Sequence, residues 1–221
     1  MSCNILGFLA TGLLFLVMQE WTDACSCGPA HPQQIYCQAD VVIKGKIIGS
    51  KMETRGNNSN SSAFRWIQYE IEQQKMYKGF EKIENIQHVY TPASDFVCGL
   101  VLEENQMNEE FVLSGNVETD GKVYINLCGF NKPWSQLTSA QKMGLGGSYE
   151  AGCQCKIIPC LALPCSITAD NQCLWIDGII DRKWVGAQSQ LLTCSMKSPG
   201  LCRWDSGKQK RAKPFLRTEN Q

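Results

Sequence analysis

The chain has 221 residues, of which 21 are basic and 21 acidic, and 43% are hydrophobic. This balance of charge gives no reason to expect a nucleic-acid partner or bulk attraction to a membrane surface, since both would favour an excess of lysine and arginine. The chain also has 13 cysteines, and so many favour disulfides and an oxidising compartment.

The first 24 residues are typical of a secretion signal. Residues 5–17 are almost wholly apolar but too few to span a bilayer, and Thr22–Ala24 offers the small residues that signal peptidase prefers. Removal of residues 1–24 would leave a mature chain that begins at Cys25. No second apolar stretch resembles a membrane span, so we expect a protein secreted to the extracellular space or matrix.

Twelve cysteines remain in the mature chain, because Cys3 belongs to the signal. An even number in a secreted chain predicts up to six disulfides. The alternative is a metal site in Cys25-Ser26-Cys27 or Cys153-Gln154-Cys155, which secretion and the presence of only two histidines disfavour. The first six cysteines are widely spread and the last six are crowded. We therefore expect an N-terminal domain over residues 25–153 and a small disulfide-rich subdomain over residues 154–221.

The N-terminal domain is predicted to be mainly β. Val41–Ile48 is rich in valine and isoleucine, and residues 67–71 alternate between apolar and polar, as in a strand with one buried face. Phe111–Leu113 continues the pattern. Asp120-Gly121 predicts a tight hairpin before the alternation at 123–127, because both central turn positions can adopt positive φ. About five antiparallel strands with long connections favour a small closed barrel, which leaves no exposed edge.

Two helices are expected beside these strands. Pro32 fits the first turn of a short helix that runs to about Cys37, and Pro133 is predicted to open a second helix through Ala140 that ends before Gly144. In the second half, the aromatic residues of Cys173–Asp177 and Trp184 are candidates for a core.

Two polar segments leave alternatives open. The loop at residues 55–62 contains the acceptor patterns of Asn57 and Asn60, which predict either N-glycosylation or an unmodified hairpin tip. The tail at residues 203–221 is rich in basic residues. We interpret it as a disordered, solvated segment, with contact to heparin-like polymers or an acidic protein face as the alternative.

The segment Cys25-Ser26-Cys27-Gly28-Pro29 has unusual physical properties. If both cysteines are bridged, Ser26 projects from a backbone that is fixed on each side, and Pro29 restricts it further, so the strip loses little entropy on binding. An α-amino group has a pKa of about 7.7 to 8.0, so part of it is neutral at physiological pH and can bind a metal. The amine and carbonyl of Cys25 could then chelate one zinc ion.

Residues Cys25–Gln34, directly after the signal, resemble the start of the tissue inhibitors of metalloproteinases. The similarity extends over nearly the whole mature chain and is closest to the branch of the second and fourth family members. It includes the order of all twelve cysteines and these motifs: Gln68–Ile71, Lys75–Lys82, Tyr90–Pro92, Val97–Gly99, Gly121–Lys122, Pro133–Trp134 and Cys173–Trp175.

The resemblance implies a five-stranded oligonucleotide-binding (OB-type) closed barrel, also called netrin-like, with flanking helices and a small disulfide-rich C-terminal subdomain. It also implies a pairing of the cysteines that their spacing does not determine. The implied bridges are Cys25–Cys98, Cys27–Cys128, Cys37–Cys153, Cys155–Cys202, Cys160–Cys165 and Cys173–Cys194.

The resemblance further implies a secreted inhibitor of matrix metalloproteinases that acts in a 1:1 complex and has no cofactor of its own. The amine and carbonyl of Cys25 would coordinate the catalytic zinc of the protease. The implied protease-binding ridge consists of Cys25, Ser26, Cys27, Gly28 and Pro29 together with Ser94, Asp95, Phe96, Val97 and Cys98.

One departure concerns the C-terminal end of the chain. Near relatives dock latent gelatinase through an acidic tail, whereas this tail carries Lys208, Lys210, Arg211, Lys213 and Arg217. We still expect latent gelatinase or an extracellular matrix polymer as the partner of the C-terminal subdomain, but the basic tail does not match the acidic tail through which relatives dock latent gelatinase.

The sequence leaves two other classes of function open. A netrin-like receptor-binding or matrix-adhesive module could use the same scaffold without inhibiting a protease. An enzyme is less well supported, because His31 and His88 have no nucleophile in a recognisable pattern beside them. We expect His31 to pack at a helix start and His88 to lie in a strand. Trp66 and Tyr69 fit core or hairpin packing better than base stacking.

Overall fold

The computed structural model describes residues 25–55 and 64–206. The predicted signal at residues 1–24, both predicted glycosylation sites and the tail residues Lys208, Lys210, Arg211, Lys213 and Arg217 lie outside this part of the chain. Within the described residues, no helix is long and apolar enough to cross a membrane.

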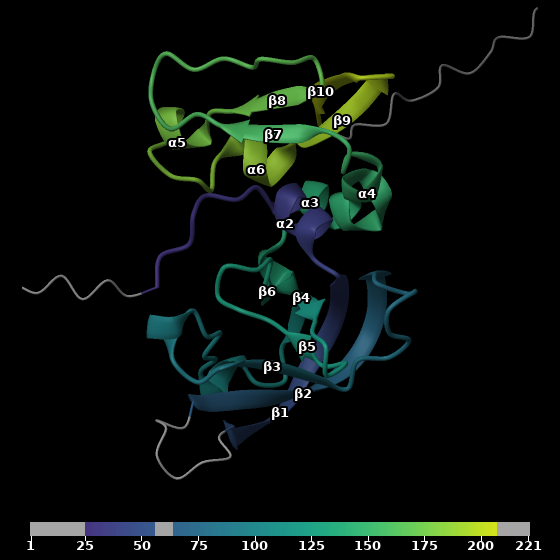
Figure 1. Ribbon diagram of the computed structural model, residues 1–221, viewed down its shortest axis with the longest axis vertical. Helices are drawn as coiled ribbons and strands as arrows, with labels where there is room; N and C mark the ends of the chain where they lie inside the picture. Colours follow the sequence, from purple (N-terminus) through teal and green to yellow (C-terminus); the bar gives the residue numbers. More distant parts are fainter. Residues whose placement is uncertain (1–24, 56–63, 207–221) are drawn as a thin grey trace, which may run out of the picture.

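The N-terminal part is a sheet whose hydrogen-bonded strands close into a ring (Figure 1). Its strands are β1 (Val41–Arg55), β2 (Phe64–Lys78), β3 (His88–Pro92), β4 (Glu110–Val117), β5 (Val123–Tyr124) and β6 (Lys132–Pro133). The pairing runs β1-β2-β3-β5-β4, and β4 pairs back to β1, while β6 extends from β4. The β3–β5 pair is parallel and the others are antiparallel. The prediction of a mainly β protein is confirmed.

The side chains that alternate along these strands fill the interior of the ring. Ile67, Tyr69 and Ile71 are buried, as predicted, and pack with inward residues of β1 and β4. The buried Tyr69 hydroxyl donates to the Leu100 carbonyl at 3.0 Å and accepts from the Leu102 amide at 3.0 Å. Burial of these apolar faces stabilises the ring, while the tyrosine fixes the 100–102 segment against it.

Irregularities in β1 bend this strand, which pairs with both β2 and β4. The register against β2 shifts between Lys44 and Gly45 and again between Ile47 and Gly49. A side chain at Gly45 would bring its Cβ to 2.8 Å from the Ile71 side chain, so glycine permits the close approach. Such irregularities bend a strand, which closure of a small ring requires.

The hairpin at Asp120-Gly121 is confirmed, although its turn differs from the prediction. Residues 118–122 connect β4 to β5, and the Gly121 amide donates to the Glu118 carbonyl at 2.9 Å. Of the two central residues only Gly121 has positive φ, at 74°. The longer loop needs one left-handed residue, which glycine supplies without strain.

The predicted continuous helix from Pro133 is wrong. Pro133 ends β6, where it pairs with Phe111, and only a single turn, η3 (Trp134–Gln136), follows directly. Thr138 then starts a new helix, α3 (Ser139–Met143), by accepting the Gln141 amide in a capping box. The strong capping signal of Thr138 outweighs the continuation expected from Pro133. The turn η4 (Gly144–Ser148) and α4 (Tyr149–Ala151) complete this region.

The C-terminal part is built around two small sheets. Strand β7 (Lys156–Pro159) runs parallel to β8 (Gln172–Trp175), and β9 (Thr193–Ser198) forms a hairpin with β10 (Leu201–Asp205). The short helices α5 (Asp177–Ile180) and α6 (Ala187–Leu191) lie between them in the sequence. The core consists of the fully buried Trp175, the buried Ile157 and buried cysteines, with Trp184 packed against it, as predicted for these aromatics.

Helix α2 (Pro32–Gln38) joins the ring to the C-terminal part. In Figure 1 it lies with α3 and α4 between the two. The fully buried His31 caps the helix, and its ring lies 5.5 Å from Trp175 and 5.3 Å from Trp204, centroid to centroid. The buried side-chain amide of Gln33 donates to the Gly152 carbonyl at 2.9 Å and to the Cys194 carbonyl at 2.8 Å, and its oxygen accepts from the Cys194 backbone amide.

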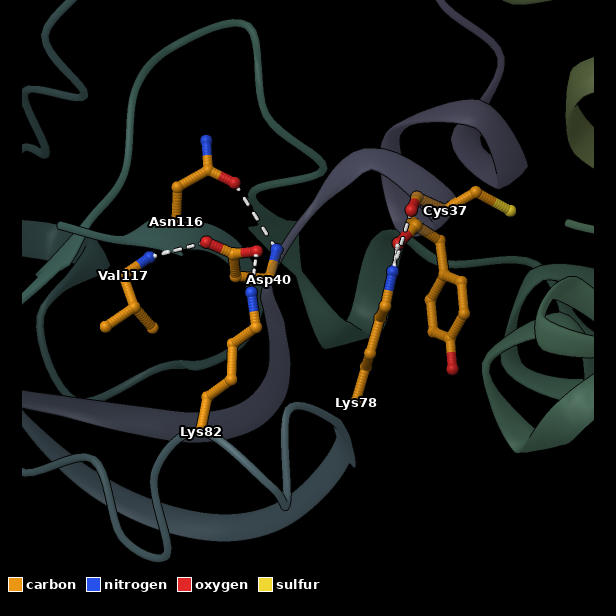
Figure 2. Close-up of polar contacts among 7 residues, drawn as sticks. Cys37, Asp40, Lys78, Lys82, Asn116 and Val117 are labelled. Atoms are coloured by element: carbon orange, nitrogen blue, oxygen red, sulfur yellow. Dashed lines mark hydrogen bonds and ion pairs between the residues drawn. The ribbon is translucent and has the colours of Figure 1, made fainter.

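The other end of α2 is tied to the ring, as Figure 2 shows. Lys78 at the end of β2 donates to the carbonyls of Tyr36 and Cys37 at 3.0 and 2.7 Å, which satisfies the last turn of the helix. Asp40 accepts from the Val117 amide at 3.0 Å and pairs with Lys82. The helix is thus held by polar contacts at both ends.

Stability should depend on pH through His31. Burial lowers the pKa of His31 from 6.5 to about 4, although the Gln188 carbonyl and Asp177 oppose this shift. Nδ1 of the neutral ring accepts a hydrogen bond from the Gln33 backbone amide, and protonation would remove that acceptor. The unfolded chain therefore binds more protons than the folded protein between these pH values. The contribution of His31 to stability is fully present above pH 6.5 and is lost as the pH falls to about 4.

We expect the contribution of His31 to the free energy of unfolding, measured in urea with the disulfides intact, to fall by about 3 kcal/mol between pH 7 and pH 4. His31→Asn keeps a capping acceptor but cannot titrate, so its free energy of unfolding should fall less over the same range. Equal pH dependence of the two proteins would contradict the assignment.

Candidate functional site

Two neighbouring disulfides fix the start of the described chain. Cys25 is bonded to Cys98 and Cys27 to Cys128, so both neighbours of Ser26 are covalently held. The sulfurs of Cys98 and Cys128 lie 4.0 Å apart, which places the two bonds side by side. Such cross-links restrict the backbone before anything binds.

The described cysteines form six disulfides, and their pairs are the ones that the family resemblance implies. The others are Cys37–Cys153, Cys155–Cys202, Cys160–Cys165 and Cys173–Cys194. Two groups of three cysteines bring their sulfurs within 4.8 Å of one another, but every one of them belongs to a disulfide. The alternative of a thiolate metal site in the two Cys-x-Cys segments is therefore wrong, since a metal needs the free thiolate.

The strip that follows these bonds is exposed. Ser26, Cys27 and Gly28 are exposed, Cys25 and Pro29 are partly buried, and the chain becomes fully buried at His31. In Figure 1 this strip is the extended segment, coloured purple, that leads into α2. It is held by disulfides at one end and by the buried helix cap at the other.

The second predicted segment, Ser94–Cys98, is a compact turn. Ser94 caps the short helix η1 (Asp95–Val97) by accepting the Phe96 amide at 3.3 Å, and its carbonyl accepts the Gly99 amide at 2.9 Å. Cys98 adopts a left-handed conformation with φ of 61°, which turns the chain back toward the ring. Phe96 and Val97 are 63% and 47% exposed, which is high for large apolar side chains.

A third segment, residues 126–128, supports the other two. The family resemblance implied its Cys128 bridge, but sequence reasoning missed the contacts of Asn126 and Leu127. The Leu127 amide donates to the Cys98 carbonyl at 2.8 Å, and the Asn126 side chain accepts the Cys128 amide at 2.9 Å. An asparagine whose side chain can accept the backbone amide two residues later is a common turn signal, but it does not reveal which part of the chain the turn will contact. The disulfides bring the two predicted segments together, and the name ridge is kept for these two, with residues 126–128 as their support.

The ridge offers a particular set of chemical groups. Its exposed side chains are the Ser26 hydroxyl and the apolar Phe96 and Val97, beside the Asp95 carboxylate. With the sulfurs bonded, the groups at its tip that could coordinate a metal are the Cys25 carbonyl oxygen and, once the bond to Ala24 is cleaved, the Cys25 amine. The arrangement suits insertion into another molecule's groove better than catalysis, which would need a positioned base and nucleophile.

Comparison with known proteins places this geometry in context. Residues 23–204 match the family model described as tissue inhibitor of metalloproteinase. The chain is 41% identical over 213 residues to Metalloproteinase inhibitor 2 of Cavia porcellus, which covers 96% of each chain. It is 42% identical over 185 residues to Metalloproteinase inhibitor 4 of Mus musculus, covering 84% of this chain and 82% of that one. It is 38% identical over 199 residues to Metalloproteinase inhibitor 3 of Scyliorhinus torazame, covering 90% and 89%.

Two glycines at the ridge should respond differently to alanine. A Cβ at Gly99 would lie 2.7 Å from the Ser94 carbonyl oxygen and closer still to that of Pro92, whereas one at Gly28 would meet nothing within 4 Å. Gly99→Ala should lower the free energy of unfolding by about 1–3 kcal/mol, because backbone must move. Gly28→Ala should change it by less than about 0.5 kcal/mol. Denaturant titration without reductant measures both, and equal effects would show that the 92–99 turn is not close-packed.

Proposed function

The chain belongs to the tissue inhibitor of metalloproteinase family, and from this membership we propose that it is a secreted inhibitor that blocks zinc metalloproteinases with the ridge. It is accordingly an inhibitor rather than an enzyme. The observation that carries the proposal is the pair of adjacent disulfides, which hold an exposed strip around Ser26 beside the turn at Ser94–Cys98.

The proposed mechanism begins with signal cleavage, which would free the α-amino group of Cys25. Because the pKa of such a group is about 8, a useful fraction is neutral and can donate its lone pair to zinc. The amine and the carbonyl oxygen of Cys25 would together chelate the zinc of the protease. They would displace the water that otherwise attacks the peptide bond.

The rest of the ridge would occupy the cleft as a substrate does. Ser26 would point into the pocket beside the zinc, with Cys27–Pro29 along one side of the cleft and Ser94–Val97 along the other. A chain terminus would lie at the metal where a scissile bond is needed, so the inhibitor resists cleavage. The two disulfides keep the strip in its bound form, which reduces the entropy lost on binding.

The finer architecture and partners are part of the same proposal. We assign the closed ring of strands to an OB-type, netrin-like barrel, with an inhibitory domain over residues 25–153 and a C-terminal subdomain over residues 154–221. We propose a 1:1 complex with matrix metalloproteinases in the extracellular space. Latent gelatinase or a matrix polymer remains the proposed partner of the C-terminal subdomain. The rival function, an adhesive netrin-like module, does not require a free Cys25 amine.

An added residue at the mature N-terminus tests the mechanism. One alanine placed before Cys25 removes the amine from the chelate, so the inhibition constant for a matrix metalloproteinase should rise at least about 100-fold. The mature mass must be verified, and the thermal midpoint should be unchanged. An alanine after Gln221 is the matched control. Unchanged inhibition by the N-terminally extended protein would contradict zinc chelation and favour the adhesive alternative.

The Ser26 side chain should contribute contacts inside the pocket. Ser26→Gly removes its hydroxymethyl group and should raise inhibition constants about 3- to 10-fold across a panel of metalloproteinases. Ser166→Gly changes an exposed serine in the C-terminal part and should leave them unaltered. If both variants inhibit as the parent protein does, Ser26 lies outside the contact.

A further inference from the structure

A hollow of about 340 Å³ opens on the outer face of the ring, and the ridge mechanism does not use it. It is lined by Trp66 of β2, Tyr124 of β5 and the turn residues Glu118, Thr119 and Asp120. The neighbours Ile67 and Val123 point into the core, so the strand alternation directs Trp66 and Tyr124 outward. This hollow is called the aromatic pocket below.

The aromatic rings of the pocket meet nearly at right angles. The Trp66 and Tyr124 centroids lie 5.2 Å apart with an interplanar angle of 79°, and Tyr90 of β3 packs on Tyr124 at 5.7 Å. Hydrogen bonds from Gln68 to the Tyr90 hydroxyl and from Tyr124 to Asp120, both at 2.9 Å, fix the rings. A corner of two rings suits a compact cation, whereas a sugar or base would stack on a flat platform.

The charge at the pocket favours a cation as well. The carboxylates of Glu118 and Asp120 line it on an exposed turn, and the Glu118 amide and the Gly121 amide close that turn at 3.0 and 2.9 Å. The same aromatic group already accepts an ammonium, because Lys122 lies 4.4 Å from the Tyr90 centroid. Lys122 is not part of the pocket lining, so the corner between Trp66 and Tyr124 is separate from this contact.

The pocket lies beside the ridge through shared strands. Trp66 pairs with Pro92, and the Ala93 amide donates to the Arg65 carbonyl at 3.0 Å, directly before the ridge segment begins at Ser94. On the other side, Tyr124 precedes the 126–128 support by two residues. A protein seated on the ridge would therefore bring the rim of its groove next to the aromatic pocket.

We propose that the aromatic pocket binds the ammonium or guanidinium group of a lysine or arginine on the rim of the metalloproteinase cleft. The inference rests on the proposed inhibitory function, to which it adds selectivity among proteases. Contact of a cation with aromatic faces and carboxylates is worth about a 3- to 30-fold change in affinity. Proteases with a cation at this rim position should be inhibited more strongly than those without one.

The test compares inhibition constants for metalloproteinases with and without a basic residue at that rim. Trp66→Leu and Glu118→Gln should weaken inhibition of the first group about 3- to 30-fold and leave the second group unchanged. Replacing the basic residue of the protease by methionine should remove the difference. Glu84→Gln changes an exposed carboxylate in the connection between β2 and β3, at the far end of β2, and is the matched control.

Inhibition constants that stay within about twofold for both variants on every protease would overturn the aromatic-pocket proposal. If Trp66→Leu is misfolded, the result for Glu118→Gln alone decides the comparison. Failure of the parent protein to inhibit any metalloproteinase would instead overturn the proposed function. In that case, a measurement without protease tests whether the aromatic pocket binds a cation. The Trp66 indole resonance should shift on titration with N-acetyl-lysine methylamide but not with its side-chain-acetylated analogue, and equal shifts would overturn a cation site.

Discussion

The covalent attachment of residues 25–27 to two loops of the ring is the constraint on which the rest of this structure depends. A free N-terminal strip would sample many conformations, and ordering it on binding would cost about 1–2 kcal/mol per residue in backbone entropy. The Cys25–Cys98 and Cys27–Cys128 bonds remove most of that freedom during folding. The strip can therefore present backbone atoms, which are poor recognition groups when mobile, as an ordered surface.

The fold supports these bonds from three directions. The ring of strands holds the turns that contain Cys98 and Cys128, and the hydrogen bond from Leu127 to Cys98 joins the two turns. At the other end of the strip, the buried His31 and Gln33 attach α2 to the C-terminal part. The C-terminal part thus contributes to the order of the ridge without forming any of its exposed surface.

Sequence patterns predicted the elements that interactions between near neighbours in the sequence determine. The alternation at residues 67–71 and the proline in the first turn of α2 are short-range signals, and both elements formed as expected. The helix from Pro133 failed because Thr138 provides a stronger local start and Pro133 pairs with a strand distant in sequence. Gln33 could not have been assigned, since its partners lie 119 and 161 residues away. For the same reason, the segment at Ser94–Cys98 came from family resemblance, and the supporting contacts of Asn126 and Leu127 were missed.

The central claim is that the backbone of Cys25 coordinates the catalytic zinc of the target protease. A crystal structure of the mature protein bound to a metalloproteinase catalytic domain tests this claim most directly. The account predicts the Cys25 amine nitrogen and carbonyl oxygen as zinc ligands at about 2.0–2.2 Å, with the hydrolytic water gone. A complex in which the zinc keeps that water and the ridge lies elsewhere would contradict it.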